Sequence, residues 1–181
     1  MSGSATDDAR VSLSEHGGLE VLHHRGVVER HPHPPSVFEE QLQAWGFVLA
    51  VEEYVDRYAL TDRIDTASLD MFNDPWPSGY DAHFLSNIFH DWGWERCRLL
   101  ARQSFESLPA GGRIYLHEML LEDTRDAPLA ATSFSMNMIF FTQGKQFTAG
   151  ELEVLLDEAG FEEITITPTC GYYSLVTGRK R

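Results

Sequence analysis

Apolar residues recur at helical spacing in the first well-patterned stretch of the chain, residues 37–58. Four large apolar side chains stand three or four positions apart there: Phe38, Leu42, Trp45 and Leu49. This spacing predicts an amphipathic helix, or two helices with a weak point at Gly46, because glycine is a poor helix former.

Strand-like and helical patterns then alternate to the C-terminus. Apolar runs predict strands over residues 63–69, 82–89, 113–121, 163–169 and 172–177, the last two joined in a hairpin around Cys170 and Gly171. Apolar periodicity predicts helices over residues 94–108 and 129–141. The alternation indicates an α/β fold, with a doubly wound, mostly parallel sheet that carries helices on both faces.

A third helix is marked by its two ends. Thr148 and Glu151 form a capping box, in which each side chain accepts a hydrogen bond from the other's backbone N–H. An apolar stripe follows, and Gly160 suits the left-handed position that ends a helix. The helix is therefore expected to begin directly after Thr148 and to end at Gly160.

The first 36 residues have a different composition. They hold five of the eight histidines and three prolines, with little periodicity beyond a short alternation at Leu19 and Val21. We expect an irregular or degenerate segment over residues 1–36 and one α/β domain over residues 37–181. His23, His24, His31 and His33 complete no recognisable ligand spacing with a cysteine or carboxylate, so no metal site is expected.

Charge and cysteine content narrow the class of partner. The formal net charge is −14, which argues against nucleic acid and against an anionic membrane surface. Cys97 and Cys170 lie in apolar surroundings and show no paired spacing, as expected for reduced cysteines. The first residues lack the pattern of a secretory signal, so we expect a cytoplasmic protein.

Candidate chemistry lies at the ends of the predicted strands. In sheets of this kind, ligands bind beyond the carboxyl ends of the strands. Asp70 follows the strand predicted at 63–69, and Glu118 lies near the end of the strand predicted at 113–121. Residues 87–91 lie at the end of the strand predicted at 82–89 and directly after it.

Seven short motifs at and between these strand ends occur in a recognisable order. They are L-D-M-F (69–72), D-P-W-P-S-G-Y-D (74–81), S-N-I-F-H-D-W (86–92), L-P-A-G-G-R (108–113), H-E-M-L-L (117–121), T-Q-G-K-Q-F-T (142–148) and L-L-D-E-A-G-F (155–161). In this order they resemble the catalytic C-terminal part of the bacterial and plant small-molecule O-methyltransferases, which include the caffeate and hydroxyindole enzymes. The resemblance covers roughly two-thirds of the chain.

The resemblance implies a sheet of the class I methyltransferase type, S-adenosylmethionine as cofactor, and methyl transfer to a hydroxyl of an aromatic or polyketide-like molecule. It makes His90 the general base and Glu118 the acid that orients its imidazole. A second family glutamate falls on Gln146 in this chain. The resemblance places Asp70, Met71 and Phe72 on the adenosine side of the site, and Asp91, Met136, Asn137, Phe140 and Phe141 in the acceptor pocket.

One family feature is altered near the N-terminus. The glycine-rich turn that approaches the cofactor falls on residues 15–21, where Gly17 and Gly18 are the counterparts of its glycines. We therefore expect an incomplete first βα unit. The family's N-terminal dimerisation domain has no counterpart either, which leaves two possible assemblies: a homodimer, or an association with a longer homologue. The alternative function is a truncated, catalytically silent methyltransferase-like protein, either a partner subunit or a gene remnant.

Overall fold

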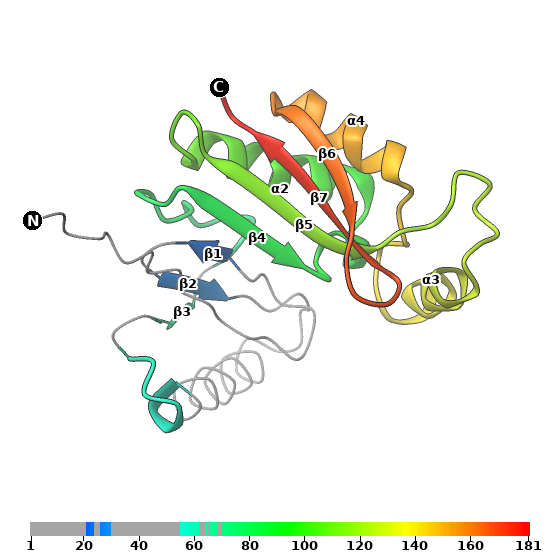
Figure 1. Cartoon of the computed structure of the whole chain (residues 1–181), viewed down its shortest axis with the longest axis horizontal. Coiled ribbons are helices and arrows are strands. Elements are labelled where there is room, and N and C mark those ends of the chain that lie inside the picture. The colour runs from blue at the N-terminus through cyan, green and yellow to red at the C-terminus, as the bar shows by residue number, and fades with distance from the viewer. Residues whose placement is uncertain (1–20, 24–25, 30–54, 62–63, 65, 69) are drawn as a thin grey trace, which may run out of the picture.

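The computed structural model describes residues 21–23, 26–29, 55–61, 64, 66–68 and 70–181 (Figure 1). The elements within these residues are β1 (Val21–His23), β2 (Gly26–Glu29), β3 (Thr66–Ser68), β4 (Ala82–Ser86), the 3₁₀ turn η1 (Phe89–Asp91), α2 (Trp94–Ser107), β5 (Arg113–Met119), α3 (Leu129–Phe141), α4 (Ala149–Ala159), β6 (Glu162–Pro168) and β7 (Tyr173–Arg179). Most of the helix expected over residues 37–58 lies outside the described residues.

Two groups of hydrogen-bonded strands make up the sheet. One has the order β1-β2-β3, and the other has the order β4-β5-β7-β6. The strand β1 lies alongside β4 (Figure 1), so the two groups follow one another as β3-β2-β1-β4-β5-β7-β6.

The α/β class is confirmed, but the sheet is mixed rather than mostly parallel. The pairs β2–β3 and β4–β5 are parallel, whereas β1–β2, β5–β7 and β6–β7 are antiparallel. Only two residues separate β1 from β2, and a parallel pair needs a crossover of roughly a dozen residues. Within residues 1–36, expected to be irregular or degenerate, the described residues 21–23 and 26–29 form two short strands, and the rest of that segment lies outside the described residues. The C-terminal antiparallel hairpin is confirmed.

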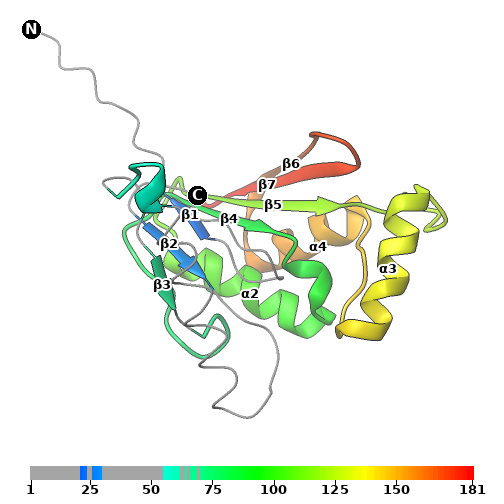
Figure 2. The ribbon, with the colours of Figure 1, turned by 90° about the horizontal axis from the view of Figure 1, so that it is seen from below.

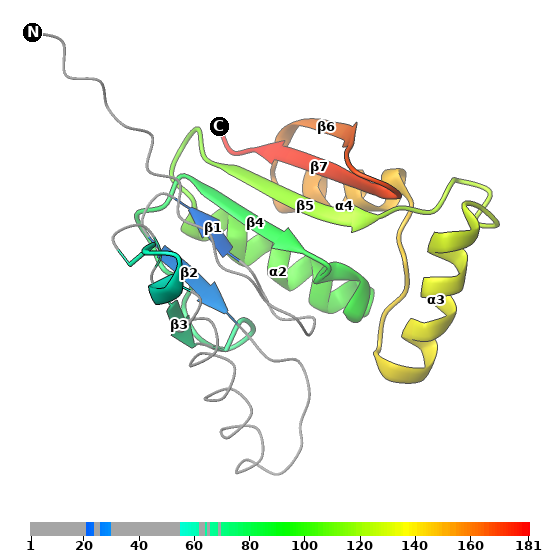
Figure 3. The ribbon, with the colours of Figure 1, turned by 60° about the horizontal axis from the view of Figure 1, so that its bottom comes forward.

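The helices α2 and α4 lie on the same face of the sheet (Figure 2). The side chains of β4 and β5 that point toward them are buried, whereas those of the opposite face are half-buried. Helices on both faces were expected, but no helix in the described ranges covers the second face. The helix α3 lies apart, beyond the carboxyl end of β5 (Figure 3).

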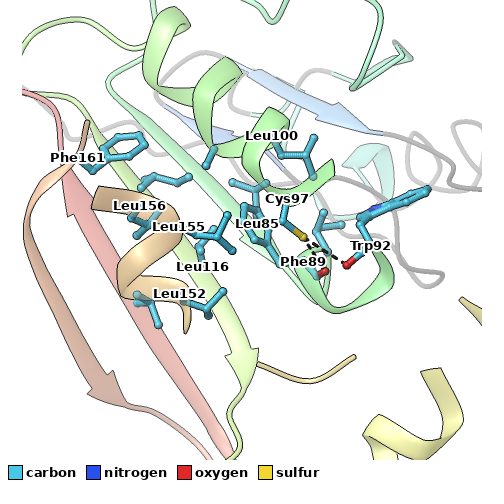
Figure 4. Packing of buried hydrophobic residues seen from close by; sticks show 14 of the residues in the cluster. Leu85, Phe89, Trp92, Cys97, Leu100, Leu116, Leu152, Leu155, Leu156 and Phe161 are labelled. Atoms are coloured by element: carbon cyan, nitrogen blue, oxygen red, sulfur yellow. Dashed lines mark hydrogen bonds between the residues drawn. The ribbon is translucent and has the colours of Figure 1, made fainter. Parts of the chain in front are cut away.

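The core fills the space between the sheet and these two helices (Figure 4). From α4, Leu152, Leu155 and Leu156 are fully buried, and from the sheet Leu85 and Leu116 are as well. Burying one such side chain contributes roughly 1.5–3 kcal/mol. This layer holds the carboxyl ends of β4 and β5 in place.

The predicted helix ends are confirmed at α4. The Thr148 hydroxyl accepts from the Glu151 N–H at 3.2 Å, and the Glu151 carboxylate accepts from the Thr148 N–H at 3.0 Å. Gly160 adopts a left-handed φ of 102°. No helix among the described residues is both long and apolar enough to span a lipid bilayer.

Candidate active site

The strand β4 ends three residues before the predicted limit, and this early end shapes the site. Asn87 has a φ of 56°, a left-handed conformation in which asparagine is one of the more tolerated residues. Its N–H donates to the His117 carbonyl of β5 at 3.1 Å. The chain then turns into η1 instead of continuing as a strand, and the turn carries His90 and Asp91.

The imidazole of His90 is fixed by Glu118. Its Nδ1 lies 2.6 Å from Oε2 of Glu118, and the two residues are only 3% and 1% exposed. Because a carboxylate can only accept, Nδ1 carries the proton of this bond. The second oxygen, Oε1, accepts from the N–H groups of Ile88 and Phe89 at 3.1 and 2.9 Å. The carboxylate therefore orients both the ring and the turn that bears it.

Two carboxylates control the protonation of His90. Burial lowers the pKa of its imidazole, but the charge of Glu118, the hydrogen bond to Glu118 and the charge of Asp91 outweigh burial. The pKa is therefore raised above the usual 6.5. Oδ1 of Asp91 lies 3.7 Å from Nε2, too far for a hydrogen bond. With Nδ1 bound to Glu118, Nε2 is the ring atom that can accept a proton.

The segment around α3 and the loop after it closes one side of the site. Phe134 of α3 meets the His90 ring edge-on, with centroids 5.4 Å apart and planes at 87°. The Gln143 N–H donates to the Asp91 carbonyl at 3.1 Å. A Cβ at Gly144 would lie 2.1 Å from the His90 carbonyl oxygen, so only glycine allows this approach.

The turn after β3 joins the same region. The Phe72 ring lies 4.8 Å from Trp92 in an edge contact, and the Arg96 guanidinium lies over both rings. Asp70 is half-buried, and its Oδ1 accepts from the Phe72 N–H at 2.9 Å. Met71 is fully buried in the core, and its carbonyl accepts from the Trp76 indole at 2.9 Å.

The structure brings together some of the sequence-predicted residues and separates others. One cluster consists of His90, Asp91 and Glu118. Phe72 contacts Trp92, which directly follows Asp91 in the chain. Four predicted pocket residues are exposed on α3: Met136, Asn137, Phe140 and Phe141. By helical spacing Asn137 and Phe141 share a side with Phe134, whereas Met136 and Phe140 lie on the opposite side. Gly17 and Gly18 lie outside the described residues.

Sequence reasoning missed three features of the site. It did not predict the Ile88 and Phe89 N–H groups that bind Glu118, or the close approach of Gly144. It also did not predict that the Trp92 indole N–H is buried without a partner. The available signals were the H-D-W and T-Q-G-K-Q motifs, which hold Trp92 and Gly144 but do not show that their loops touch.

Comparisons with known proteins identify the family of the chain. The family model described as "O-methyltransferase domain" matches residues 46–162. The 3-hydroxy-5-methyl-1-naphthoate 3-O-methyltransferase of Streptomyces sahachiroi is 36% identical over 142 residues, which are 78% of this chain and 37% of that protein. Acetylserotonin O-methyltransferase of Gallus gallus is 39% identical over 111 residues, 61% of this chain and 32% of that protein. The chain thus spans about a third of the length of these relatives.

Solved structures give the same assignment. The crystal structure of human N-acetylserotonin methyltransferase in complex with SAM aligns with a TM-score of 0.68 and 29% identity, over 74% of this chain and 38% of that one. The O-methyltransferase family 2 protein of Planctomyces limnophilus, in complex with apigenin, aligns with a TM-score of 0.71 and 26% identity, over 75% and 41%. By sequence match and by fold, the chain belongs to the O-methyltransferase domain family.

Proposed function

We propose that the chain transfers the methyl group of S-adenosylmethionine to a hydroxyl of an aromatic or polyketide-like small molecule. The observation that carries the proposal is the buried 2.6 Å bond from His90 to Glu118 at the carboxyl ends of β4 and β5, in a chain of the O-methyltransferase family. The relatives that act on a naphthoate and on acetylserotonin support an aromatic acceptor.

His90 acts as the general base in this proposal. An aromatic hydroxyl is mostly protonated near neutral pH, so its oxygen is a better nucleophile when a base takes the proton during attack. Nε2 of His90 receives that proton, and Glu118 and Asp91 stabilise the imidazolium that forms. Glu118 also keeps the neutral ring in the tautomer whose Nε2 can accept.

The cofactor side lies along the ends of β3 and β4. When bound, S-adenosylmethionine supplies an electrophilic methyl group. Asp70 and Phe72 fit its adenosine part, because a half-buried carboxylate and an aromatic ring lie together there. The unpartnered Trp92 indole N–H beside Phe72 adds a buried donor. Met71 contributes through its place in the core beneath the turn. The assignment of Gly17 and Gly18 to the cofactor side stays a prediction, because both lie outside the described residues.

The acceptor lies between His90 and α3, with Asp91 beside the base and Asn137 and Phe141 on the side of α3 that Phe134 shares. The outer side of α3 is apolar and exposed, including Leu129, Met136 and Phe140. An exposed apolar surface of this kind marks an interaction site. We infer a homodimer or association with a longer homologue through this helix, and a cytoplasmic location.

Calorimetric titration with S-adenosylhomocysteine tests the cofactor site directly. Binding at micromolar concentration, together with methyl transfer to a hydroxynaphthoic acid followed by mass spectrometry, is the expected result. The absence of heat at millimolar ligand would instead support the catalytically silent partner. Native mass spectrometry of the same sample would report whether the chain is a monomer, a dimer or bound to a longer homologue.

A further inference from the structure

Gln146 is a buried polar residue that the fold leaves unsatisfied. Its side chain is 0% exposed, and neither the oxygen nor the nitrogen of its amide has a hydrogen-bond partner. No other amide side chain among the described residues is buried with both ends unpaired. A buried amide without partners costs about 1–3 kcal/mol, so such a group in a native protein calls for an explanation.

The backbone around Gln146 is tied to every segment that carries the proposed catalytic groups. The Gln146 N–H donates to the Ser135 hydroxyl at 3.2 Å, and Ser135 adjoins Phe134, whose ring meets His90. Gly144, two residues before Gln146, lies in close contact with the backbone of His90. These contacts hold the loop that carries Gln146 against both the turn that bears His90 and the helix that bears Phe134.

The residue after Gln146 is bound to the chain that leaves β5, the strand that carries Glu118. The Leu121 N–H donates to the Phe147 carbonyl at 2.8 Å, and the Phe147 ring is part of the core. Leu121 continues the chain from β5, three residues after Glu118. Because the Phe147 carbonyl and ring are held in this way, the loop keeps the neighbouring Gln146 side chain buried.

We propose that the Gln146 carboxamide binds a second oxygen function of the methyl acceptor, a carbonyl or carboxylate carried on the same aromatic skeleton as the hydroxyl that reacts. This inference rests on the proposed function. The amide nitrogen donates to that oxygen, while Nε2 of His90 serves the reacting hydroxyl. Two polar contacts at separate points of a planar molecule fix its orientation.

The negative charges around His90 favour this assignment. Glu118 and Asp91 already place two carboxylates at His90, and a third at position 146 would repel an acceptor oxygen that bears negative charge. An amide is neutral and offers two N–H donors, so it accommodates such an oxygen. Position 146 thereby selects the oxygen-rich acceptor rather than adding to the basicity of the imidazole.

The test compares two acceptors with the full chain and its Gln146→Met variant. One acceptor is a hydroxynaphthoic acid, and the other is the naphthol that lacks the carboxylate. Methionine has a similar volume and removes only the amide. We expect kcat/KM for the acid to fall about 10- to 100-fold, as for a lost hydrogen bond to a substrate group, and kcat/KM for the naphthol to change by less than about threefold. Calorimetric affinity for the acid, measured with S-adenosylhomocysteine present, should weaken by the same factor.

Stability supplies a second measurement. Replacing an unsatisfied buried amide by an apolar group of similar shape is neutral or stabilising, so the Tm of Gln146→Met should be unchanged or higher. Gln103→Met is the control, because Gln103 on α2 also has a buried unpaired amide oxygen. Its Nε2 donates to the Phe72 carbonyl at 3.2 Å, so this variant should lower Tm, and any effect through Phe72 on the cofactor side is common to both acceptors. The control should therefore leave the discrimination between the two acceptors as in the wild type.

Three outcomes would overturn the inference. Gln146→Met could lower kcat/KM equally for both acceptors, could change neither, or could weaken discrimination no more than Gln103→Met does. The second outcome would indicate that a resident water satisfies the amide. A wild-type chain that binds no S-adenosylhomocysteine and methylates neither acceptor would refute the proposed function itself, and this inference with it.

Discussion

Two buried histidines, one near the amino end of β4 and one in the turn η1 that follows the strand, have opposite acid–base properties. His83 is 0% exposed, and burial lowers its pKa to about 3. Its Nδ1 bonds to the Ser104 hydroxyl of α2 at 2.8 Å, and its ring meets Trp76. His90 is nearly as buried, yet its pKa is raised because Glu118 and Asp91 outweigh burial.

The difference shows that partners, not burial, decide which histidine can act as a base. Desolvation disfavours the charged form at both positions. His83 faces α2, which offers the neutral hydroxyl of Ser104 and apolar side chains. The end of β4 faces the carboxylate of Glu118, so the same ring can hold a proton at ordinary pH. The fold thus has one structural histidine and one that suits proton transfer.

Replacing each of the two histidines in turn should give the largest difference between them, because only His90 is proposed to take part in proton transfer. His90→Ala should lower turnover about 10²- to 10⁴-fold, the usual contribution of a general base, and leave S-adenosylhomocysteine affinity nearly unchanged. His83→Leu is the control and should keep turnover within about threefold in the folded fraction, because it changes only the packing and the Ser104 bond between β4 and α2. Steady-state kinetics and calorimetry give both values. A fully active His90→Ala would end the assignment of the base.

Removing the carboxylate should make His90 resemble His83. In Glu118→Gln the amide oxygen can still accept from the turn, but the charge is gone, so burial dominates and the pKa of His90 falls. The wild-type rate should rise with pH as His90 deprotonates, with a midpoint above the usual 6.5. In the variant this acid limb should move to lower pH, and kcat should fall about 10- to 100-fold, as is typical when an orienting partner is lost.

A pH–rate profile of Glu118→Gln with the same midpoint as the wild type would contradict this prediction. That result would show that the midpoint belongs to another group. Titration of the His90 Cε1–H signal by NMR would decide between the two, because it follows the imidazole itself.

The sequence predicted His90 but not the contrast with His83. Motif order located His90 and Glu118, and periodicity with caps located α2, α3 and α4. The apolar run at 82–89 did not reveal the end of β4 at Ser86, because a left-handed residue such as Asn87 leaves no mark in a hydrophobic pattern. Whether a buried histidine faces a hydroxyl or a carboxylate depends on the neighbouring element, which is tertiary information.

The same limit applies to the strand directions and to the loop before α4. A short apolar alternation predicts a strand but not its direction, so the reversed β1 was not foreseen. The unpaired amide of Gln146 arises from loop packing, since its environment comes from segments distant in the sequence. Family resemblance identified the position, and only the packing showed that its amide has no partner.

Acid should destabilise the fold through His83. In the unfolded chain this imidazole titrates near 6.5, and in the folded chain near 3, so the unfolded state binds more protons between these values. Going from pH 7 to pH 5 should therefore cost about 2 kcal/mol through this one group. Urea unfolding at both pH values should show that His83→Leu combined with Ser104→Ala removes this loss. An unchanged pH dependence would mean that His83 is protonated in the folded state.

His90 should contribute in the opposite direction. Because its folded pKa is raised, its stabilisation is fully present below the unfolded value of 6.5 and is lost as pH rises through the folded value. His90→Ala should therefore reduce stability more at pH 6 than at pH 9. The same unfolding series measures both histidines and compares the two signs directly.

The smallest expected effect is that of substituting Asp91. It tests which of the two carboxylates contributes more to the raised pKa of His90. Asp91 acts on the imidazole through charge alone at 3.7 Å, whereas Glu118 adds a 2.6 Å hydrogen bond. Asp91→Asn should therefore lower the pKa of His90, but by less than Glu118→Gln does. NMR titration of His90 in both single variants and in the double variant would measure the two contributions and their coupling. A shift in Asp91→Asn equal to or larger than that in Glu118→Gln would make Asp91 the main charge partner, and the buried bond to Glu118 would then position the ring without controlling its proton.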